Sequence, residues 1–237
     1  MTDKKNSGGG SISDRRYKKE RVKTSARRKI GSTRWLERQL NDPYVQEARR
    51  LGLRSRAAFK LRDIQKKYRL MKSTHNIVDL GCAPGGWIQV ALENIGEKGH
   101  VVGMDLLEVE PIGEAIMLQG DFTEDDAPDR LKAEMKGKAN GVLSDMAANT
   151  TGHKPTDHLR IMALVEMAAY FAFEVLEKDG YFVAKVFSGG TENTLLLLLK
   201  KHFTKIHHFK PESSRKDSAE MYVVATGFKD NYIADTY

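Results

Sequence analysis

Strand-like and helical patterns alternate along most of this chain, and the alternation restricts the fold more than any other feature. Seven short apolar runs have the composition of strands, at residues 76–80, 100–105, 115–121, 140–145, 180–187, 205–210 and 220–228. Helical spacing lies between most of them and is clearest at 157–177, where Gly180 is expected to end the helix, and at 191–201. The pattern predicts an α/β fold, with a mostly parallel, doubly wound sheet and helices on both faces. The last two runs have no helix between them, which predicts an antiparallel hairpin at one edge.

Charge is divided unequally along the sequence. Residues 1–72 carry 23 lysines and arginines against 7 acids, whereas residues 73–237 carry 16 against 25. A basic front on an acidic body indicates a polyanionic partner, and nucleic acid explains it better than a tail that only improves solubility.

The basic front divides into two parts. Residues 1–30 are polar and Gly/Ser-containing, so they are predicted to be a disordered basic tail. Residues 31–72 show helical spacing, at Trp35, Leu36 and Leu40 and again from Ala57 to Tyr68. We therefore expect one folded domain over residues 31–237 that begins with a basic helical segment.

Several classes of protein are excluded by what the sequence lacks. No apolar run is long enough to span a membrane, and the N-terminus has no signal-peptide pattern. The one cysteine, Cys82, has no disulfide partner within the chain, which fits a cytoplasmic protein. The histidines show no metal-ligand spacing, so no metal is predicted. Nothing in the sequence demands a dimer, and a monomer is expected.

A glycine-rich turn follows the first predicted strand, in "NIVDLGCAPGGWIQV" at residues 76–90. Glycines permit positive φ and close approach of backbone to a ligand, and ligands bind where parallel strands end. The spacing is not the G-x-G-x-x-G of dinucleotide enzymes. It is not a phosphate-binding loop either, because Trp87 stands where that loop has lysine. The turn therefore predicts a nucleoside-like ligand without a polyphosphate.

Two acids follow the next two predicted strands. Asp105 ends the second run, where a carboxylate can reach ribose hydroxyls, and Asp121 follows the third, where it can accept from an adenine amino group. Each acid alone is more often a turn residue. Together with the glycine-rich turn, they predict an adenosine site.

Several motifs together resemble the FtsJ/RlmE-type methyltransferases. They are "DLGCAPGGW", "GDF", "LSDMAANTTG", "FVAKVF" and "KPESSRKDSAEMYVVATG", with "GSTRWL" and "RSRAAFKL" before them. The resemblance covers about residues 31–229. It implies a Rossmann-like seven-stranded sheet, S-adenosyl-L-methionine as cofactor, and 2′-O-methylation of a nucleotide in large-subunit ribosomal RNA. A uridine in the assembled large ribosomal subunit is the expected target.

The resemblance also implies the residues of the site. Those expected to contact the cofactor are Gly85, Trp87, Asp105, Asp121 and Asp145. The family's catalytic Lys-Asp-Lys-Glu set falls on Lys60, Asp145, Lys185 and Glu220.

The chemistry of the reaction suits the same four residues, but only Lys185 indicates a function when judged alone. A ribose hydroxyl is a poor nucleophile at neutral pH, so the enzyme must align it with the methyl group and help it lose its proton. Lys185 interrupts the apolar run "YFVAKVF", an unfavourable place for an ammonium unless it is paired. Lys60 and Glu220, judged alone, would be ordinary surface charges. The loop residues Ser213, Ser214 and Arg215 are expected to contact RNA phosphate.

Three other functions stay open from the sequence. A nicotinamide or flavin enzyme is disfavoured by the missing glycine motif. A non-catalytic ribosome-assembly protein that binds RNA is disfavoured by the complete catalytic set. A 2′-O-methyltransferase of transfer RNA or of a messenger cap cannot be separated from the ribosomal reading by sequence.

Overall fold

The structure is a computed structural model that describes residue 12 and residues 30–148, 152–187 and 193–232. The prediction of a disordered tail at residues 1–30 lies almost wholly outside these residues. The chain divides into two compact units, residues 1–56 and residues 57–237. Within the described residues, no helix has the length and apolar character needed to cross a membrane.

The described part of the first unit is helical, as predicted. Helix α1 spans Ile30–Leu40 and α2 spans Pro43–Arg50. Asp42 caps α2, because its Oδ1 accepts a hydrogen bond of 3.0 Å from the backbone N–H of Tyr44. Pro43 stands in the first turn of the helix, where a missing N–H costs nothing.

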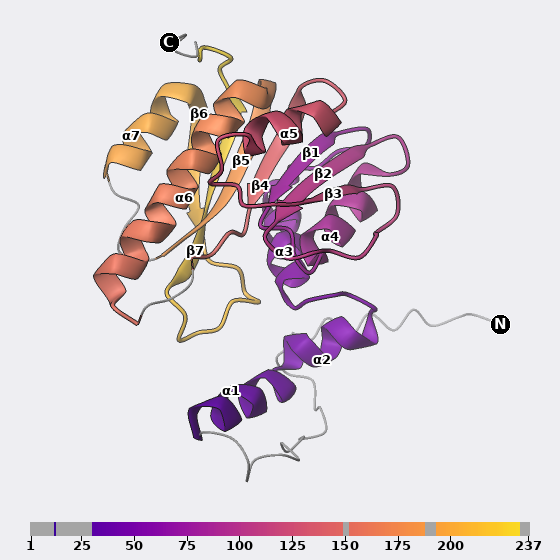
Figure 1. Cartoon of the computed structure of the whole chain (residues 1–237), viewed down its shortest axis with the longest axis vertical. Coiled ribbons are helices and arrows are strands. Elements are labelled where there is room, and N and C mark those ends of the chain that lie inside the picture. The colour runs from indigo at the N-terminus through magenta and orange to yellow at the C-terminus, as the bar shows by residue number, and fades with distance from the viewer. Residues whose placement is uncertain (1–11, 13–29, 149–151, 188–192, 233–237) are drawn as a thin grey trace, which may run out of the picture. The chain divides into compact units, whose positions relative to one another are not determined.

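The second unit contains a seven-stranded sheet in the order β3-β2-β1-β4-β5-β7-β6 (Figure 1). All seven predicted strands are confirmed, and their bounds are β1 Asn76–Leu80, β2 His100–Asp105, β3 Ile116–Gln119, β4 Ala139–Ser144, β5 Leu176–Phe187, β6 Phe203–Phe209 and β7 Glu220–Phe228. The first five are parallel. Strand β7 runs antiparallel to both of its neighbours, so the predicted edge hairpin of β6 and β7 is also confirmed.

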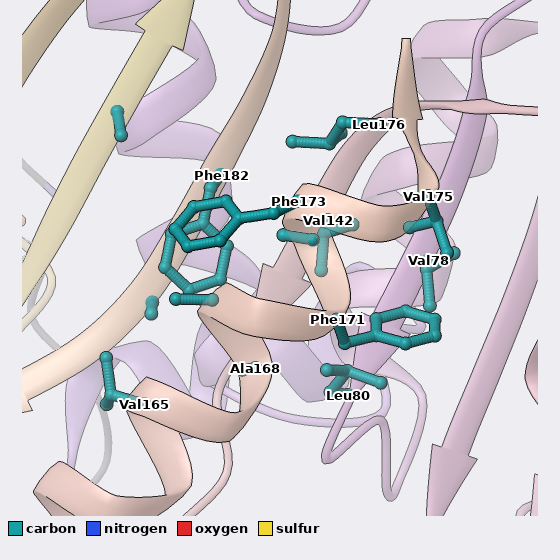
Figure 2. Packing of buried hydrophobic residues seen from close by; sticks show 14 of the residues in the cluster. Val78, Leu80, Val142, Val165, Ala168, Phe171, Phe173, Val175, Leu176 and Phe182 are labelled. Carbon is teal, nitrogen blue, oxygen red and sulfur yellow. The ribbon is translucent and has the colours of Figure 1, made fainter. Parts of the chain in front are cut away.

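Helices cover both faces of the sheet, as the alternation predicted (Figure 1). Their bounds are α3 Ala57–Tyr68, α4 Gly86–Ile95, α5 Ala127–Glu134, α6 Lys154–Val175 and α7 Asn193–His202. Helices α5, α6 and α7 share one apolar core with the strands. Figure 2 shows part of it, with Phe173 of α6 near Phe182 and Val142 of the sheet, and Phe171 near Val78 and Leu80. Burying such large apolar side chains supplies most of the stability of a layered fold.

One boundary of α6 differs from the prediction that Gly180 ends it. The helix stops at Val175, and Leu176 is already extended and begins β5. Gly180 lies inside β5, where an added Cβ would come within 2.8 Å of the carbonyl oxygen of Glu177. Gly180 is therefore required by a close backbone approach, and the prediction that it ends the helix is wrong.

The order of strands reverses between β1 and β4. From β1 the chain proceeds through β2 to β3 on one side, and from β4 to β5 on the other. Ligands of doubly wound sheets bind at such a switch point, beyond the carboxyl ends of the strands. Gly81 follows β1 there, and Asp145 follows β4.

Candidate active site

The glycine-rich turn after β1 has the backbone geometry that its sequence predicts. Gly81 has a φ of +78°, and a Cβ at this position would lie 2.8 Å from the backbone nitrogen of Met146. Gly85 has a φ of +104° and precedes the first turn of α4. Both conformations favour glycine, so the turn brings backbone close to the switch point.

Asp105, at the end of β2, holds the turn in place. Its Oδ2 accepts a hydrogen bond of 2.9 Å from the N–H of Ala83, and its Oδ1 accepts one of 2.9 Å from the N–H of Leu107. A carboxylate has about four lone-pair sites. Two remain on Asp105 for the hydroxyls of a ligand.

Asp121 lies beyond the end of β3 and is ionised. Its Oδ1 accepts hydrogen bonds from the N–H and the hydroxyl of Thr123, at 2.9 and 2.7 Å. These bonds hold the pKa of Asp121 below its ordinary value. The other oxygen, Oδ2, forms no hydrogen bond with the described residues, so it can accept from a ligand.

A cavity of about 110 Å³ brings these residues together. Its lining includes Gly81, Asp105 and Asp121. Apolar side chains complete it, from Met104, Leu106, Phe122, Met146 and Leu164. A pocket with apolar walls and two acids at strand ends can hold an adenosine-like group.

Gly85 and Trp87 do not line this cavity. The indole of Trp87 is buried, its Nε1–H donates to the carbonyl of Ala57 at 2.9 Å, and its ring lies 5.6 Å from that of Tyr222. The backbone N–H groups of the first turn of a helix have no partner within the helix. A contact between Trp87 and a cofactor would therefore come from its backbone, and for both residues this contact stays a prediction.

A third carboxyl group, on Asp79, lies buried in β1 beneath the turn. The side chain is fully buried, and neither oxygen has a hydrogen-bond partner among the described residues. Burial raises the pKa of Asp79 well above its ordinary value, and the charges of Asp145 and Asp105 raise it further. Sequence reasoning gave Asp79 no role, although an acid within an apolar strand was a signal. The carboxylates of Asp105 and Asp121, which line the cavity, favour a cationic ligand over a phosphate.

Asp79→Asn should change how stability depends on pH. Because the pKa of Asp79 is raised in the folded state, the folded protein keeps a proton that the unfolded chain releases above about pH 4. Ionisation of Asp79 in the unfolded chain therefore lowers the free energy of unfolding of the protein as the pH rises. We expect the melting temperature to fall less between pH 5 and pH 8 in Asp79→Asn than in the parent.

Thermal unfolding followed by circular dichroism at several pH values measures this difference. Asp125→Asn is a suitable control, because Asp125 is exposed. Equal pH slopes for the parent and Asp79→Asn would show that Asp79 titrates normally.

The four predicted catalytic residues form two ion pairs. Lys60 of α3 lies 2.7 Å from Oε2 of Glu220 on β7. The Nζ of Lys185 on β5 lies 3.1 Å from Oδ1 of Asp145 and donates to the backbone oxygen of that residue at 2.6 Å. The side chains are only 9–17% exposed. A mostly buried ammonium group needs a carboxylate partner, and each of these two lysines has one.

Tyr222 joins the two pairs. Its hydroxyl donates to Oδ1 of Asp145 at 2.9 Å, and the Nζ of Lys60 lies 5.9 Å from its ring centroid. Burial and the charges of Asp145 and Glu220 raise its pKa well above the ordinary value, so the hydroxyl stays a donor. Sequence reasoning missed Tyr222. The signal was its position two residues after Glu220, which places both side chains on one face of β7.

Two loop serines do not have the role expected from sequence. Ser213 is buried, and its N–H and hydroxyl both donate to Oδ2 of Asp63, at 2.9 and 2.7 Å. The buried hydroxyl of Ser214 donates to Oε1 of Glu220 at 3.0 Å. The prediction that these serines contact RNA phosphate is wrong, because their polar groups hold the loop and Glu220 in position.

The described part of the chain contains no cluster of side chains that could bind a metal ion. Among residues 30–148, 152–187 and 193–232, no three His, Cys, Asp or Glu side chains are placed to hold a metal ion.

The buried thiol of Cys82 has a pKa raised by burial and by the charge of Asp79, which makes it a poor nucleophile.

Several known proteins are similar to this chain in sequence. A protein named ribosomal RNA large subunit methyltransferase E, from Paramagnetospirillum magneticum, is 59% identical over 94% of this chain and 93% of its own length. A protein of the same name from Parvibaculum lavamentivorans is 56% identical, over 94% of this chain and 92% of its own.

Structure and family comparisons agree. A crystal structure from Plasmodium falciparum, described as that of a ribosomal RNA methyltransferase, superposes with a TM-score of 0.66. It is 32% identical in sequence and covers 74% of this chain and 98% of its own. The family of FtsJ-like methyltransferases matches residues 53–228, which include the sheet, the cavity and both ion pairs. The chain belongs to the FtsJ-like methyltransferase family.

Proposed function

We propose that this protein transfers a methyl group from S-adenosyl-L-methionine to a ribose 2′-hydroxyl of large-subunit ribosomal RNA. The observation that carries the proposal is the pair of lysine–carboxylate contacts that meet at Tyr222, near the carboxyl ends of the parallel strands β4 and β5. The names of the relatives support ribosomal RNA as the substrate. A uridine in the assembled subunit, a monomeric enzyme and a cytoplasmic location are parts of the same proposal.

The charge of the site supports S-adenosylmethionine as cofactor. Asp79, Asp105 and Asp145 lie close enough for the charges of the last two to raise the pKa of the first. Such a site disfavours the pyrophosphate of a nicotinamide or flavin cofactor and favours a sulfonium cation. We assign Asp105 to the ribose hydroxyls of the cofactor and Asp121 to its adenine amino group. Gly85, Trp87 and Asp145 would complete the contacts.

The ion pairs suit the activation of a hydroxyl group. S-adenosylmethionine supplies an electrophilic methyl group, so the protein must place the hydroxyl oxygen in line with it. Positioning of this kind can supply up to about 7–11 kcal/mol, and a general base adds about 10²–10⁴-fold. Lys185 hydrogen-bonds the hydroxyl. The proton leaves to Nζ of Lys185 when that amine is neutral, and to solvent when it is charged.

The other members of the set hold Lys185 and the ribose. Asp145 fixes Nζ of Lys185 through its carboxylate and its backbone oxygen. Tyr222 orients that carboxylate. Glu220 holds Lys60, and we assign Lys60 to binding the ribose or the adjoining phosphate of the substrate.

Methyl transfer to separated RNA substrates tests this function. The full chain is incubated with S-adenosylmethionine labelled in its methyl group, and with assembled large subunits, extracted ribosomal RNA, transfer RNA or capped messenger RNA. We expect label in large-subunit RNA. Label only in transfer RNA or in capped RNA would contradict the ribosomal assignment, and no label in any fraction would contradict the enzymatic one.

Asp105→Ala and Asp121→Ala should weaken cofactor binding. A hydrogen bond to a charged group contributes about 1.5–3 kcal/mol, so we expect each variant to lose roughly 10- to 150-fold in affinity. Asp105→Ala should have the larger effect, because Asp105 also accepts from Ala83 and so holds the glycine-rich turn. Calorimetry with S-adenosylmethionine measures both, and unchanged affinities would contradict the adenosine site.

A further inference from the structure

A basic surface with aromatic rings lies where the end of α3 meets the edge strand β6. Its exposed cations are Lys66, Lys67, Arg69, Lys205 and Lys210. The rings come from both elements: Tyr68 lies 5.4 Å from His207 and 5.7 Å from Phe209, measured between ring centroids. We call these residues the α3–β6 surface.

The charges of the α3–β6 surface are not neutralised. Within the described part of the chain, none of its five cations forms an ion pair with a carboxylate. Lys210 donates to the backbone oxygens of Lys216 and Ser218, which carry no net charge. By contrast, Arg62, Lys132 and Lys138 each pair with an acid. A group of unpaired cations beside aromatic rings, on a domain that is otherwise acidic, favours a polyanionic ligand at this surface.

The rings restrict the kind of polyanion. The Nζ of Lys67 lies 4.5 Å from the centroid of Phe209, so cation and ring share one site. His207 is exposed, and Tyr68 and Phe209 are partly exposed. Aromatic rings among unpaired cations bind single-stranded nucleic acid, because bases stack on the rings while phosphates meet the cations.

The α3–β6 surface adjoins the catalytic residues. Phe209 is the cross-strand partner of Tyr222, which is in turn the partner of Lys185. Neighbouring strands lie about 4.8 Å apart, so Phe209 stands about 10 Å from Lys185. Along α3, Lys67 lies seven positions after Lys60, which is again about 10 Å. A strand of RNA with its ribose at Lys185 can therefore reach this surface.

We propose that the α3–β6 surface binds an unpaired segment of RNA flanking the methylated nucleotide. The proposal deepens the proposed function and rests on it for the identity of the substrate. The surface gives affinity through phosphates and stacking, whereas the ion pairs perform the chemistry.

Binding to ribosomal RNA extracted from large subunits, titrated at several salt concentrations, tests the surface. The double variant Lys67→Glu/Lys205→Glu should bind at least about tenfold more weakly and reduce the slope of log K against log salt by about 1.5. His207→Leu should lower the affinity for RNA by about fivefold and leave the affinity for heparin unchanged, because only bases stack. The matched control is Lys98→Glu/Lys178→Glu, which makes the same change of charge at two exposed lysines elsewhere.

The outcomes of this experiment distinguish a failure of the α3–β6 surface proposal from a failure of the proposed function. Equal losses in Lys67→Glu/Lys205→Glu and in the control would overturn the proposal, because net charge alone would explain them. Parallel losses for heparin and RNA in His207→Leu would overturn the stacking contact. RNA binding is measured without methyl transfer, so an inactive enzyme would leave this test intact. Cofactor affinity should stay at the parent value in all three variants.

Discussion

Lys185→Ala should slow single-turnover methyl transfer by about 100-fold or more, with RNA and cofactor saturating. The loss is the usual scale for removing a group that positions a hydroxyl or takes its proton. The fold should persist, because the apolar neighbours of Lys185 in β5 stay buried and Asp145 keeps its hydrogen bond from Tyr222. Cofactor affinity should change little, since Lys185 does not line the cavity that holds Asp105 and Asp121. Rapid-quench measurement of labelled methyl transfer gives the rate.

Two further variants control for charge and for position on the strand. Lys185→Arg should also fail, because a guanidinium keeps its proton and has a different shape. Lys178→Ala changes an exposed lysine near the start of the same strand and should keep the parent rate. A near-normal single-turnover rate in Lys185→Ala would move the central role to Lys60.

Asp145→Asn should cost about as much activity as the loss of Lys185. The substitution removes the carboxylate that lies 3.1 Å from Nζ of Lys185 and that accepts the hydroxyl of Tyr222. Because the two residues act as one unit, the effects should not add. We expect each single variant to lose about 100-fold in single-turnover rate, and the double variant Lys185→Ala/Asp145→Asn to lose no more than about threefold beyond either one.

Glu166→Gln offers a comparison for Asp145→Asn, because it also neutralises one carboxylate but lies on α6. It should leave the rate unchanged. Losses that multiply to about 10⁴ in the double variant would mean that Asp145 and Lys185 contribute independently, which contradicts the pairing as the basis of their function.

Local pattern was sufficient to predict most of the fold. The seven strands are short apolar runs, and their composition does not depend on distant contacts. The end of α6 was missed because it depends on tertiary pairing. Strand β5 begins at Leu176, where it pairs with Ala139, a residue far away in sequence. Helix α2 has only eight residues, so its apolar pattern is short, although Asp42 and Pro43 mark its start.

The placement of the candidate site residues was predictable where those residues follow strands. Asp105, Asp121 and Asp145 are found by asking which acids follow strands. Tyr222 could not be found in this way, because its role comes from its register opposite Lys185 and from complete burial. Ser214 looked like a solvent-exposed phosphate ligand, and only the fold shows that its hydroxyl is directed at Glu220.

The position of the transferred methyl group tests the central claim most directly. Large ribosomal subunits are methylated with labelled S-adenosylmethionine, their RNA is digested to nucleosides, and the labelled product is identified by mass spectrometry. We predict a single 2′-O-methylated nucleoside, a uridine, that forms about 100-fold more slowly, or slower still, when Lys185→Ala replaces the parent enzyme. A methyl group on a base rather than on the ribose oxygen, or equal labelling by Lys185→Ala, would contradict the account.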